Sequence, residues 1–148
     1  MIGHSGRERL VVVGNGMVGL RSVEELLAVA PDRYDITIVG AEPHPGYNRI
    51  LLSAVLAGEK TVGEIVAHPR SWYDERGIAL IVGDPVAAID RCAKTVRTAG
   101  GVTLAYDELL LATGSKPLAL PIPGLALPGV SAFRDIADVE TMIAAAHT

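Results

Sequence analysis

The clearest chemical signal in this sequence is a set of three glycines spaced as in a nucleotide-binding turn. Gly14, Gly16 and Gly19 follow the apolar run 10–13 directly, and Met17 lies between them. Gly14 would permit a tight turn, Gly16 would let a pyrophosphate approach the backbone, and Gly19 would let a helix pack closely on a strand. The free N–H groups and the positive dipole end of that helix would attract the phosphates. The spacing therefore predicts a dinucleotide site that includes Met17. The alternative is a strand-to-helix turn without a ligand.

Glu42 is the second candidate binding residue, because it stands just after another apolar segment, residues 35–40. A carboxylate at the end of the second strand can accept hydrogen bonds from both ribose hydroxyls of a dinucleotide. It would also repel a 2′-phosphate, so FAD or NAD is the expected ligand and NADP is not. The alternative is a solvated carboxylate in a loop.

These residues require a strand–helix–strand unit to hold them. The continuous apolar runs 10–13 and 35–40 predict strands that are buried on both faces, as in a parallel sheet. Between them, residues 17–30 follow the helical period, and Arg21 and Glu25 are spaced for an i,i+4 ion pair. The apolar face expected for this helix comprises Leu20, Val23, Leu27 and Ala30.

The rest of the chain predicts a mixture of helices and strands. The predicted helices are residues 47–57, 69–76 and 135–146. The predicted strands are residues 78–83, 86–90, 95–98, 102–106 and 108–112. The three middle strands are short and separated by turn residues, which is typical of an antiparallel meander, and the last is a buried run. Residues 116–129 are proline-rich and predict an extended connector. The apolar residues expected to face inward are Ile50, Leu51, Val55 and Leu56 in the first helix and Ile136, Val139, Ile143 and Ala146 in the last.

Composition and charge argue against several classes of function. The formal net charge is −4 and no basic stripe is present, so neither nucleic acid nor an anionic membrane is an expected partner. The longest apolar run is too short to span a bilayer, and the polar N-terminal residues lack a signal-peptide core, which points to the cytoplasm. The single cysteine, Cys92, excludes an intramolecular disulfide and an iron–sulfur cluster held by this chain alone, and its place at a turn indicates a structural role. The four histidines are scattered, so no metal site is predicted.

The meander followed by Leu109-Leu-Leu-Ala-Thr-Gly114 resembles the FAD domain of the two-dinucleotide flavoprotein reductases. The resemblance implies an α/β, Rossmann-like FAD/NAD(P)-binding fold with a parallel sheet and an antiparallel β-meander, incomplete at its C-terminus. It also implies that Thr113 and Gly114 form a second turn near the flavin nucleotide.

Residues 47–53, Tyr-Asn-Arg-Ile-Leu-Leu-Ser, narrow this resemblance, because they contain no redox cysteine pair. The segment is similar to the assimilatory NAD(P)H nitrite reductase subgroup of the pyridine nucleotide-disulfide oxidoreductase-like flavoproteins, and also to rubredoxin and ferredoxin reductases. This resemblance implies that Asn48 and Arg49 lie beside the FAD phosphates and the flavin entrance, and that the backbone of Val86 contacts adenine. Arg49 as a surface arginine and Val86 as a plain core residue are the alternatives. No catalytic residue is predicted.

The resemblance further implies a domain organisation. Residues 1–118 would form part of an FAD-binding domain, and residues 119–148 a connector and helix leading toward an NAD(P)H-binding domain that is absent here. Electrons would pass from NAD(P)H through FAD to a downstream metal centre, with siroheme and an Fe–S cluster only in the full-length protein. A piece of a rubredoxin or ferredoxin reductase and a stand-alone nucleotide-binding module are the alternatives. The 148 residues alone are expected to be inactive, to retain little FAD, and to form a homo-oligomer through the uncovered sheet or the C-terminal segment.

Overall fold

The computed structural model describes residues 6–118 and 120–146, so the N-terminal residues 1–5 and position 119 of the predicted connector lie outside it. The described residues belong to two compact units. The first unit falls within Met1–Tyr47 and Val66–Thr113, and the second within Asn48–Ile65 and Gly114–Thr148. No helix of the described residues is both long and apolar enough to cross a membrane.

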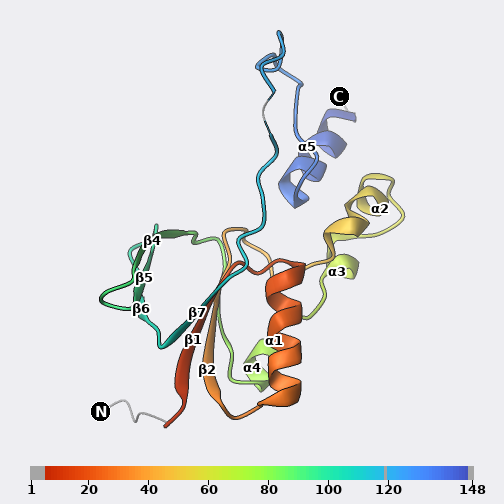
Figure 1. Cartoon of the computed structure of the whole chain (residues 1–148). Coiled ribbons are helices and arrows are strands. Elements are labelled where there is room, and N and C mark those ends of the chain that lie inside the picture. The colour runs from red at the N-terminus through yellow and green to blue at the C-terminus, as the bar shows by residue number, and fades with distance from the viewer. Residues whose placement is uncertain (1–5, 119, 147–148) are drawn as a thin grey trace. The chain divides into compact units, whose positions relative to one another are not determined.

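A four-stranded parallel sheet forms the centre of the first unit (Figure 1). Its strand order is β3-β2-β1-β7, with β1 at Glu8–Val13, β2 at Tyr34–Val39, β3 at Ala79–Ile81 and β7 at Glu108–Leu111. Helix α1, Met17–Val29, connects β1 to β2, and helix α4, Arg70–Glu75, precedes β3. All four described residues of the run 10–13 are buried, which confirms the prediction of a central strand covered on both faces.

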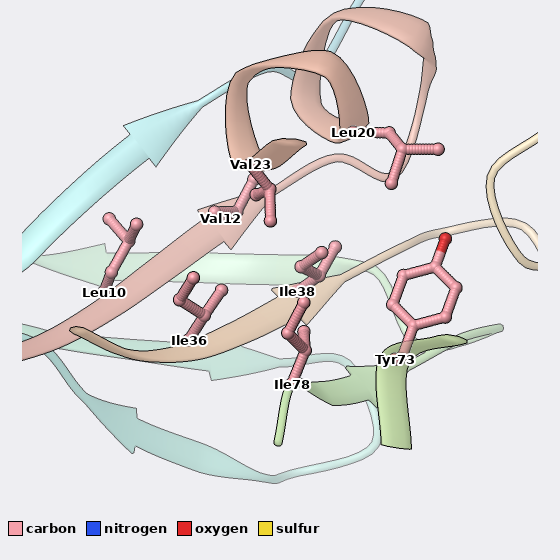
Figure 2. Close-up of a cluster of buried hydrophobic side chains, with 8 residues drawn as sticks. All are labelled: Leu10, Val12, Leu20, Val23, Ile36, Ile38, Tyr73 and Ile78. Carbon is pink, nitrogen blue, oxygen red and sulfur yellow. The ribbon is translucent and has the colours of Figure 1, made fainter. Parts of the chain in front are cut away.

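Each face of the sheet packs against a different layer. On the α1 and α4 side the buried cluster comprises Leu10, Val12, Leu20, Val23, Ile36, Ile38, Tyr73 and Ile78 (Figure 2). The other face holds a second cluster of Val11, Val13, Val39, Val96 and Tyr106. Val96 comes from the antiparallel meander of β4 (Val86–Asp90), β5 (Thr95–Thr98) and β6 (Thr103–Ala105), and Tyr106 directly follows β6. The predicted meander and the Arg21–Glu25 ion pair on α1 are both confirmed.

The last strand differs from its prediction as a fully buried run. Leu109 and Leu110 are half-buried, and the Leu111 side chain is 58% exposed. Among the described strands, β7 pairs only with β1, so it lies at the edge of the sheet. A continuous apolar run is typical of a strand covered on both faces, and this cover is incomplete for β7 at the edge of the sheet.

The second unit contains a short 3-10 helix and three α-helices. The 3-10 helix η1 is Arg49–Leu51, followed by α2 at Leu52–Leu56, α3 at Val62–Ile65 and α5 at Ile136–Ala146. Helix α5 packs against α2, and the buried residues of the unit are Leu52, Val55, Ile65, Ile136 and Val139. The predicted helix 135–146 is therefore confirmed, although Ala146 is exposed and only Ile136 and Val139 of its expected face are fully buried.

The predicted helix 47–57 needs correction at its start and on its inner face. Tyr47 forms a β-bridge with Val66 instead of opening the helix. Of the residues expected to point inward, Ile50 and Leu56 are exposed. The initial 3-10 turn has three residues per turn instead of 3.6, so it shifts the phase of the face that follows. As a result Leu52 is buried, although the α-helical period predicted Leu51 and not Leu52 at the inward position.

Two further corrections concern segments between the predicted elements. Helix α3 was not predicted, although Thr61 and Glu64 form a capping box in which each side chain accepts a hydrogen bond from the other residue's N–H. The bonds that the Glu64 carboxylate accepts from the Thr61 N–H at 2.7 Å and the Thr61 hydroxyl at 2.8 Å lower the pKa of this carboxyl. The predicted extended connector contains successive turns over residues 122–130, which Gly124 and Gly129 permit through φ angles of +90° and +88°.

An ion pair joins the start of β1 to the residue before β7. The Asp107 carboxylate accepts hydrogen bonds from the Arg9 guanidinium at 2.9 and 2.8 Å and from the Arg9 backbone N–H at 2.8 Å. These side-chain and backbone bonds from Arg9 hold the pKa of the Asp107 carboxyl well below its usual range. A group whose pKa is depressed by folding stabilises the fold above its unfolded pKa, about 4, and this contribution is lost as pH falls through the folded pKa.

Asp107→Asn is therefore expected to lower the free energy of unfolding at neutral pH, with the difference from wild type shrinking progressively below about pH 4. Urea denaturation over a pH series measures this difference. Asp32→Asn is the control, because Asp32 pairs with Arg7 at 2.6 Å but its side chain is 84% exposed. A penalty for Asp107→Asn that stays constant down to strong acid would contradict the assignment.

Candidate functional site

Two of the three motif glycines are required by the fold itself. Gly14 has a φ of +112°, and a Cβ placed on it would lie 2.1 Å from the Ala112 carbonyl oxygen. A Cβ on Gly19 would lie 2.3 Å from the Gly14 carbonyl oxygen and 3.3 Å from the Ala112 Cβ. Gly14 therefore makes the tight turn after β1, and Gly19 lets α1 approach that turn and the end of β7. Both tasks match those predicted from the spacing.

Gly16 has no such requirement. Its φ of −84° and ψ of −177° are accessible to any residue, and a Cβ placed on it would meet no described atom within 4 Å. The absence of a side chain at Gly16 thus leaves an open space directly beside the backbone at the start of α1. A pyrophosphate that approaches the backbone needs this space.

The N-terminus of α1 borders the same space. The helix begins at Met17, whose side chain is 44% exposed, and no side chain among the described residues caps it. The first intrahelical bond runs from the Leu20 N–H to the Gly16 carbonyl oxygen at 3.0 Å. The first N–H groups of a helix have no intrahelical partner and are the groups that bind phosphate at such turns.

The ends of three neighbouring strands meet at the glycine turn. The Gly14 N–H donates to the Val39 carbonyl oxygen at the end of β2, and the Ala112 N–H after β7 donates to Val13 at the end of β1, both at 2.8 Å. Thr113 therefore follows β7 at the same edge of the sheet as the glycine motif. In open parallel sheets, ligands bind at this carboxyl edge.

Glu42 is held at this edge through both its backbone and its side chain. Its carbonyl oxygen accepts from the Gly83 N–H at 2.9 Å, and its Oε2 accepts from the Tyr47 hydroxyl at 2.6 Å. The loop also contacts the glycine turn, because a Cβ on Gly40 would lie 3.1 Å from the Asn15 Cβ. The structure thus brings the half-buried Glu42 to the carboxyl edge where the glycine motif lies.

Val86 belongs to a segment that is hydrogen-bonded to the same loop. The Asp84 N–H donates to the Gly40 carbonyl oxygen at 3.3 Å, and β4 begins two residues later. The side chain of Val86 packs against the cluster on the meander side of the sheet, and its backbone pairs with Thr98. A bulge between Val86 and Ala88 interrupts this pairing.

Three of the predicted site residues lie in the second unit. The Asn48 side chain accepts from the Ile50 N–H at 3.1 Å and caps η1. Arg49 donates through a guanidinium nitrogen to the carbonyl oxygen of Arg134, two residues before α5, at 2.6 Å, so it does not lie free on a helix surface. Gly114 has a φ of +69°, a left-handed backbone conformation that glycine adopts without steric cost.

Sequence reasoning did not find the polar residues that connect the glycine turn to its surroundings. Tyr73 is fully buried, and its hydroxyl accepts from the Gly46 N–H at 3.3 Å and donates to the Asn15 Oδ1 at 3.5 Å. Burial raises the pKa of the Tyr73 phenol. The Nδ2 of Asn15 is buried and has no hydrogen-bond partner among the described residues. Asn15 lies between Gly14 and Gly16, at a position that the glycine motif leaves variable, so the spacing of the motif did not single it out.

The described residues contain no cluster of three or more histidine, cysteine or acidic side chains that could hold a metal ion. Cys92 is exposed in the turn between β4 and β5, where its N–H donates to the Asp90 side chain at 2.9 Å. Its backbone thus helps to form a tight turn, as its position in the sequence predicted.

Comparison with known proteins agrees with the fold and the glycine motif. Residues 8–147 match the family model of the pyridine nucleotide-disulphide oxidoreductases. The chain is 53% identical over 140 residues to a nitrite reductase [NAD(P)H] of Bacillus subtilis, covering 95% of this chain and 17% of that protein. It is 35% identical over 135 residues to the nitrite reductase (NADH) large subunit of Escherichia coli, covering 90% and 16%.

Solved structures of reductases share the fold. The complex of putidaredoxin reductase with putidaredoxin superposes with a TM-score of 0.82 at 30% identity, covering 93% of this chain and 34% of the other. A ferredoxin reductase from Rhodopseudomonas palustris superposes with a TM-score of 0.85 at 26% identity, with the same coverage. The chain thus spans under a fifth of the two curated relatives and about a third of these structures. The predicted α/β nucleotide-binding fold and flavoprotein resemblance are confirmed, and the chain belongs to the pyridine nucleotide-disulphide oxidoreductase family.

Proposed function

We propose that this chain is the FAD-binding module of an NAD(P)H-dependent oxidoreductase of the nitrite reductase type. The residues that would hold the cofactor in the first unit are Gly14, Gly16, Met17, Gly19, Glu42, Val86 and Thr113. Asn48, Arg49 and Gly114 are proposed as cofactor-binding residues on the resemblance to such reductases. The relative from Bacillus subtilis with 53% identity supports this choice of reductase type.

The single observation that carries the proposal is the open space at Gly16. Gly14 and Gly19 are explained by the fold, whereas neither backbone conformation nor packing requires a glycine at Gly16. A pyrophosphate bound at the start of α1 would explain it, because a side chain there would separate the phosphate oxygens from the backbone N–H groups. The Glu42 carboxylate at the same sheet edge supplies the acceptors that an adenosine ribose needs.

The residues of this chain would bind and orient the dinucleotide, and the flavin would supply the hydride and electron transfer chemistry. In the full-length protein, electrons would pass from NAD(P)H to FAD and onward to siroheme and an Fe–S cluster. A second relative, 47% identical over 137 residues, is an assimilatory nitrate reductase electron transfer subunit of Bacillus subtilis, which agrees with a role in electron transfer.

The second candidate is the corresponding module of a ferredoxin- or rubredoxin-type reductase. The superposition on ferredoxin reductase structures favours it, as does 37% identity over 142 residues to a probable ferredoxin reductase of Castellaniella defragrans. Both candidates make the same use of the glycine turn and differ in the acceptor of the electrons. The identity of 53% to a nitrite reductase makes that reductase type the first choice.

The proposal extends to the organisation of the protein. Residues 1–118 would belong to the FAD-binding domain, and residues 119–148 would lead from it toward the NAD(P)H-binding domain. A cytoplasmic location is also proposed, in keeping with the single cysteine. Self-association is also proposed, because β7 is an edge strand and carries the exposed Leu111.

Titration of the full-length protein with FAD, after removal of bound flavin and followed by flavin absorbance and fluorescence, tests the proposal. Uptake of FAD with a shifted flavin spectrum is the expected result. Binding of AMP or NAD without any binding of FAD would favour a nucleotide-binding module that has no redox role. Absence of binding by all three nucleotides would contradict the proposed site.

Glu42→Ala is expected to weaken FAD binding by about 1.5–3 kcal/mol, because the ribose hydroxyls would lose their charged acceptor. Isothermal titration of wild type and variant measures the difference. Glu59→Ala is the matched control, because Glu59 is an exposed glutamate outside the proposed site. Equal FAD affinity of Glu42→Ala and wild type would show that this carboxylate does not bind the ribose.

A further inference from the structure

Tyr47 stands apart from the other residues near the glycine turn because its polar group reaches a proposed ligand-binding side chain. Its hydroxyl donates to the Oε2 of Glu42 at 2.6 Å, and only 6% of the residue is exposed. A short hydrogen bond to a carboxylate is charge-assisted and stronger than one between neutral groups. This bond fixes the direction in which the Glu42 carboxylate points.

The backbone of Tyr47 is itself held firmly. Tyr47 forms a β-bridge with Val66, and the neighbouring Gly46 carbonyl oxygen accepts from the Ala67 N–H at 2.9 Å. On its other side, Gly46 packs so tightly that a Cβ would lie 3.0 Å from Leu20 and 3.1 Å from the Asn15 carbonyl oxygen. The tyrosine hydroxyl therefore starts from a backbone that is anchored against α1 and the glycine turn.

The Glu42 backbone is anchored as well. Three hydrogen bonds join residues 40–42 to residues 81–84: from the Gly40 N–H to Ile81 at 2.8 Å, from the Gly83 N–H to Glu42 at 2.9 Å, and from the Asp84 N–H to Gly40 at 3.3 Å. With its backbone fixed in this way, Glu42 retains only its side-chain rotations. The bond from Tyr47 restricts those rotations, so the carboxylate is oriented before any ligand arrives.

From this geometry we infer that Tyr47 is a positioning residue for ribose recognition, acting through Glu42. The inference rests on the proposed function. A carboxylate has about four acceptor positions, so the bond from Tyr47 is compatible with hydrogen bonds from two ribose hydroxyls. Because the carboxylate is oriented in advance, the ligand does not have to order it, and affinity for the ribose rises accordingly.

Tyr47→Phe removes the hydroxyl and keeps the buried ring. FAD affinity is expected to fall about three- to tenfold, less than for the loss of a direct hydrogen bond at a charged group, because Tyr47 acts through Glu42. ADP and 2′,3′-dideoxy-ADP serve as competitors that differ only in the ribose hydroxyls. The variant is expected to lose affinity for ADP and to bind dideoxy-ADP as wild type does. In the Glu42→Ala background, Tyr47→Phe is expected to have no further effect.

Tyr106→Phe is the matched control, because Tyr106 is also 6% exposed but belongs to the cluster on the meander side of the sheet. If Tyr47→Phe weakens ADP and dideoxy-ADP equally, the residue acts on the fold and not on the ribose, and the inference is overturned. Unchanged FAD affinity would overturn it as well. Failure of wild type to bind FAD would instead contradict the proposed function itself.

A variant that does not fold would leave these comparisons without a readout, so circular dichroism of Tyr47→Phe precedes them. If Tyr47→Phe does not fold, Glu42→Asp takes its place. The shorter side chain withdraws the carboxylate from the Tyr47 hydroxyl and keeps the charge. The preference for ADP over dideoxy-ADP is then expected to fall. Retention of the wild-type preference would overturn the inference.

Discussion

Replacement of Gly16 by valine is expected to abolish FAD binding while the sheet and α1 remain folded. The backbone at Gly16 has an extended conformation that valine adopts readily, and a Cβ there meets no described atom within 4 Å. The protein itself therefore accommodates the side chain. A bound pyrophosphate does not, because the valine methyl groups would separate it from the N–H groups at the start of α1. Losing two hydrogen bonds to a charged group, about 1.5–3 kcal/mol each, lowers the affinity by about 100-fold or more.

Two measurements on the same variant separate binding from folding. FAD titration is expected to show the loss of affinity, and urea denaturation to show a free energy of unfolding close to that of wild type. Gly63→Val is the matched control, because a Cβ on Gly63 in α3 would come no closer than 3.9 Å to another atom and Gly63 lies outside the proposed site. If Gly16→Val binds FAD as tightly as Gly63→Val, the pyrophosphate does not lie against this turn.

The local elements of the first unit could be predicted because their signals lie within a few residues of each other. The apolar run 10–13, the glycine spacing and the helical period of residues 17–30 together give β1, the turn and α1. The signals failed where the outcome depends on a distant segment. Leu111 is exposed because no described strand pairs on the outer side of β7, and Tyr47 leaves the predicted helix because it pairs with Val66.

In the candidate site, too, the local features could be predicted from the sequence and the contacts between distant residues could not. Gly14 and Gly19 could be assigned their tasks from spacing alone, since each acts on the strand or turn beside it. The bond from Tyr47 to Glu42 and the contacts of Tyr73 with Asn15 and Gly46 could not be predicted. The hydroxyl of Tyr73 reaches a residue 58 positions away, and such a contact exists only after α4 has packed on the sheet. Periodicity carries no information about which distant side chains meet.

Gly14→Ala is expected to have the opposite outcome from Gly16→Val, with the fold itself lost or severely weakened. The φ of +112° at Gly14 is unfavourable for any residue with a Cβ, and that Cβ would lie 2.1 Å from the Ala112 carbonyl oxygen. Relief of this overlap requires the end of β7 to move away from β1, which breaks the hydrogen bond from the Ala112 N–H to Val13. Strain and displacement together are expected to cost about 3–5 kcal/mol. That is a large part of the 5–15 kcal/mol by which small domains are stable.

Gly101→Ala separates the two contributions to the loss of stability, which are backbone strain and steric overlap. Gly101 has a φ of +91°, but a Cβ there would meet no described atom within 4 Å, so its substitution adds backbone strain without overlap. Urea denaturation is expected to show a loss of about 1–2 kcal/mol for Gly101→Ala and a much larger loss for Gly14→Ala. Equal losses would mean that the Ala112 carbonyl moves aside at little cost. The turn after β1 and the end of β7 would then be less rigidly coupled than their contact indicates, and the carboxyl edge could not hold a dinucleotide by the geometry of its backbone alone.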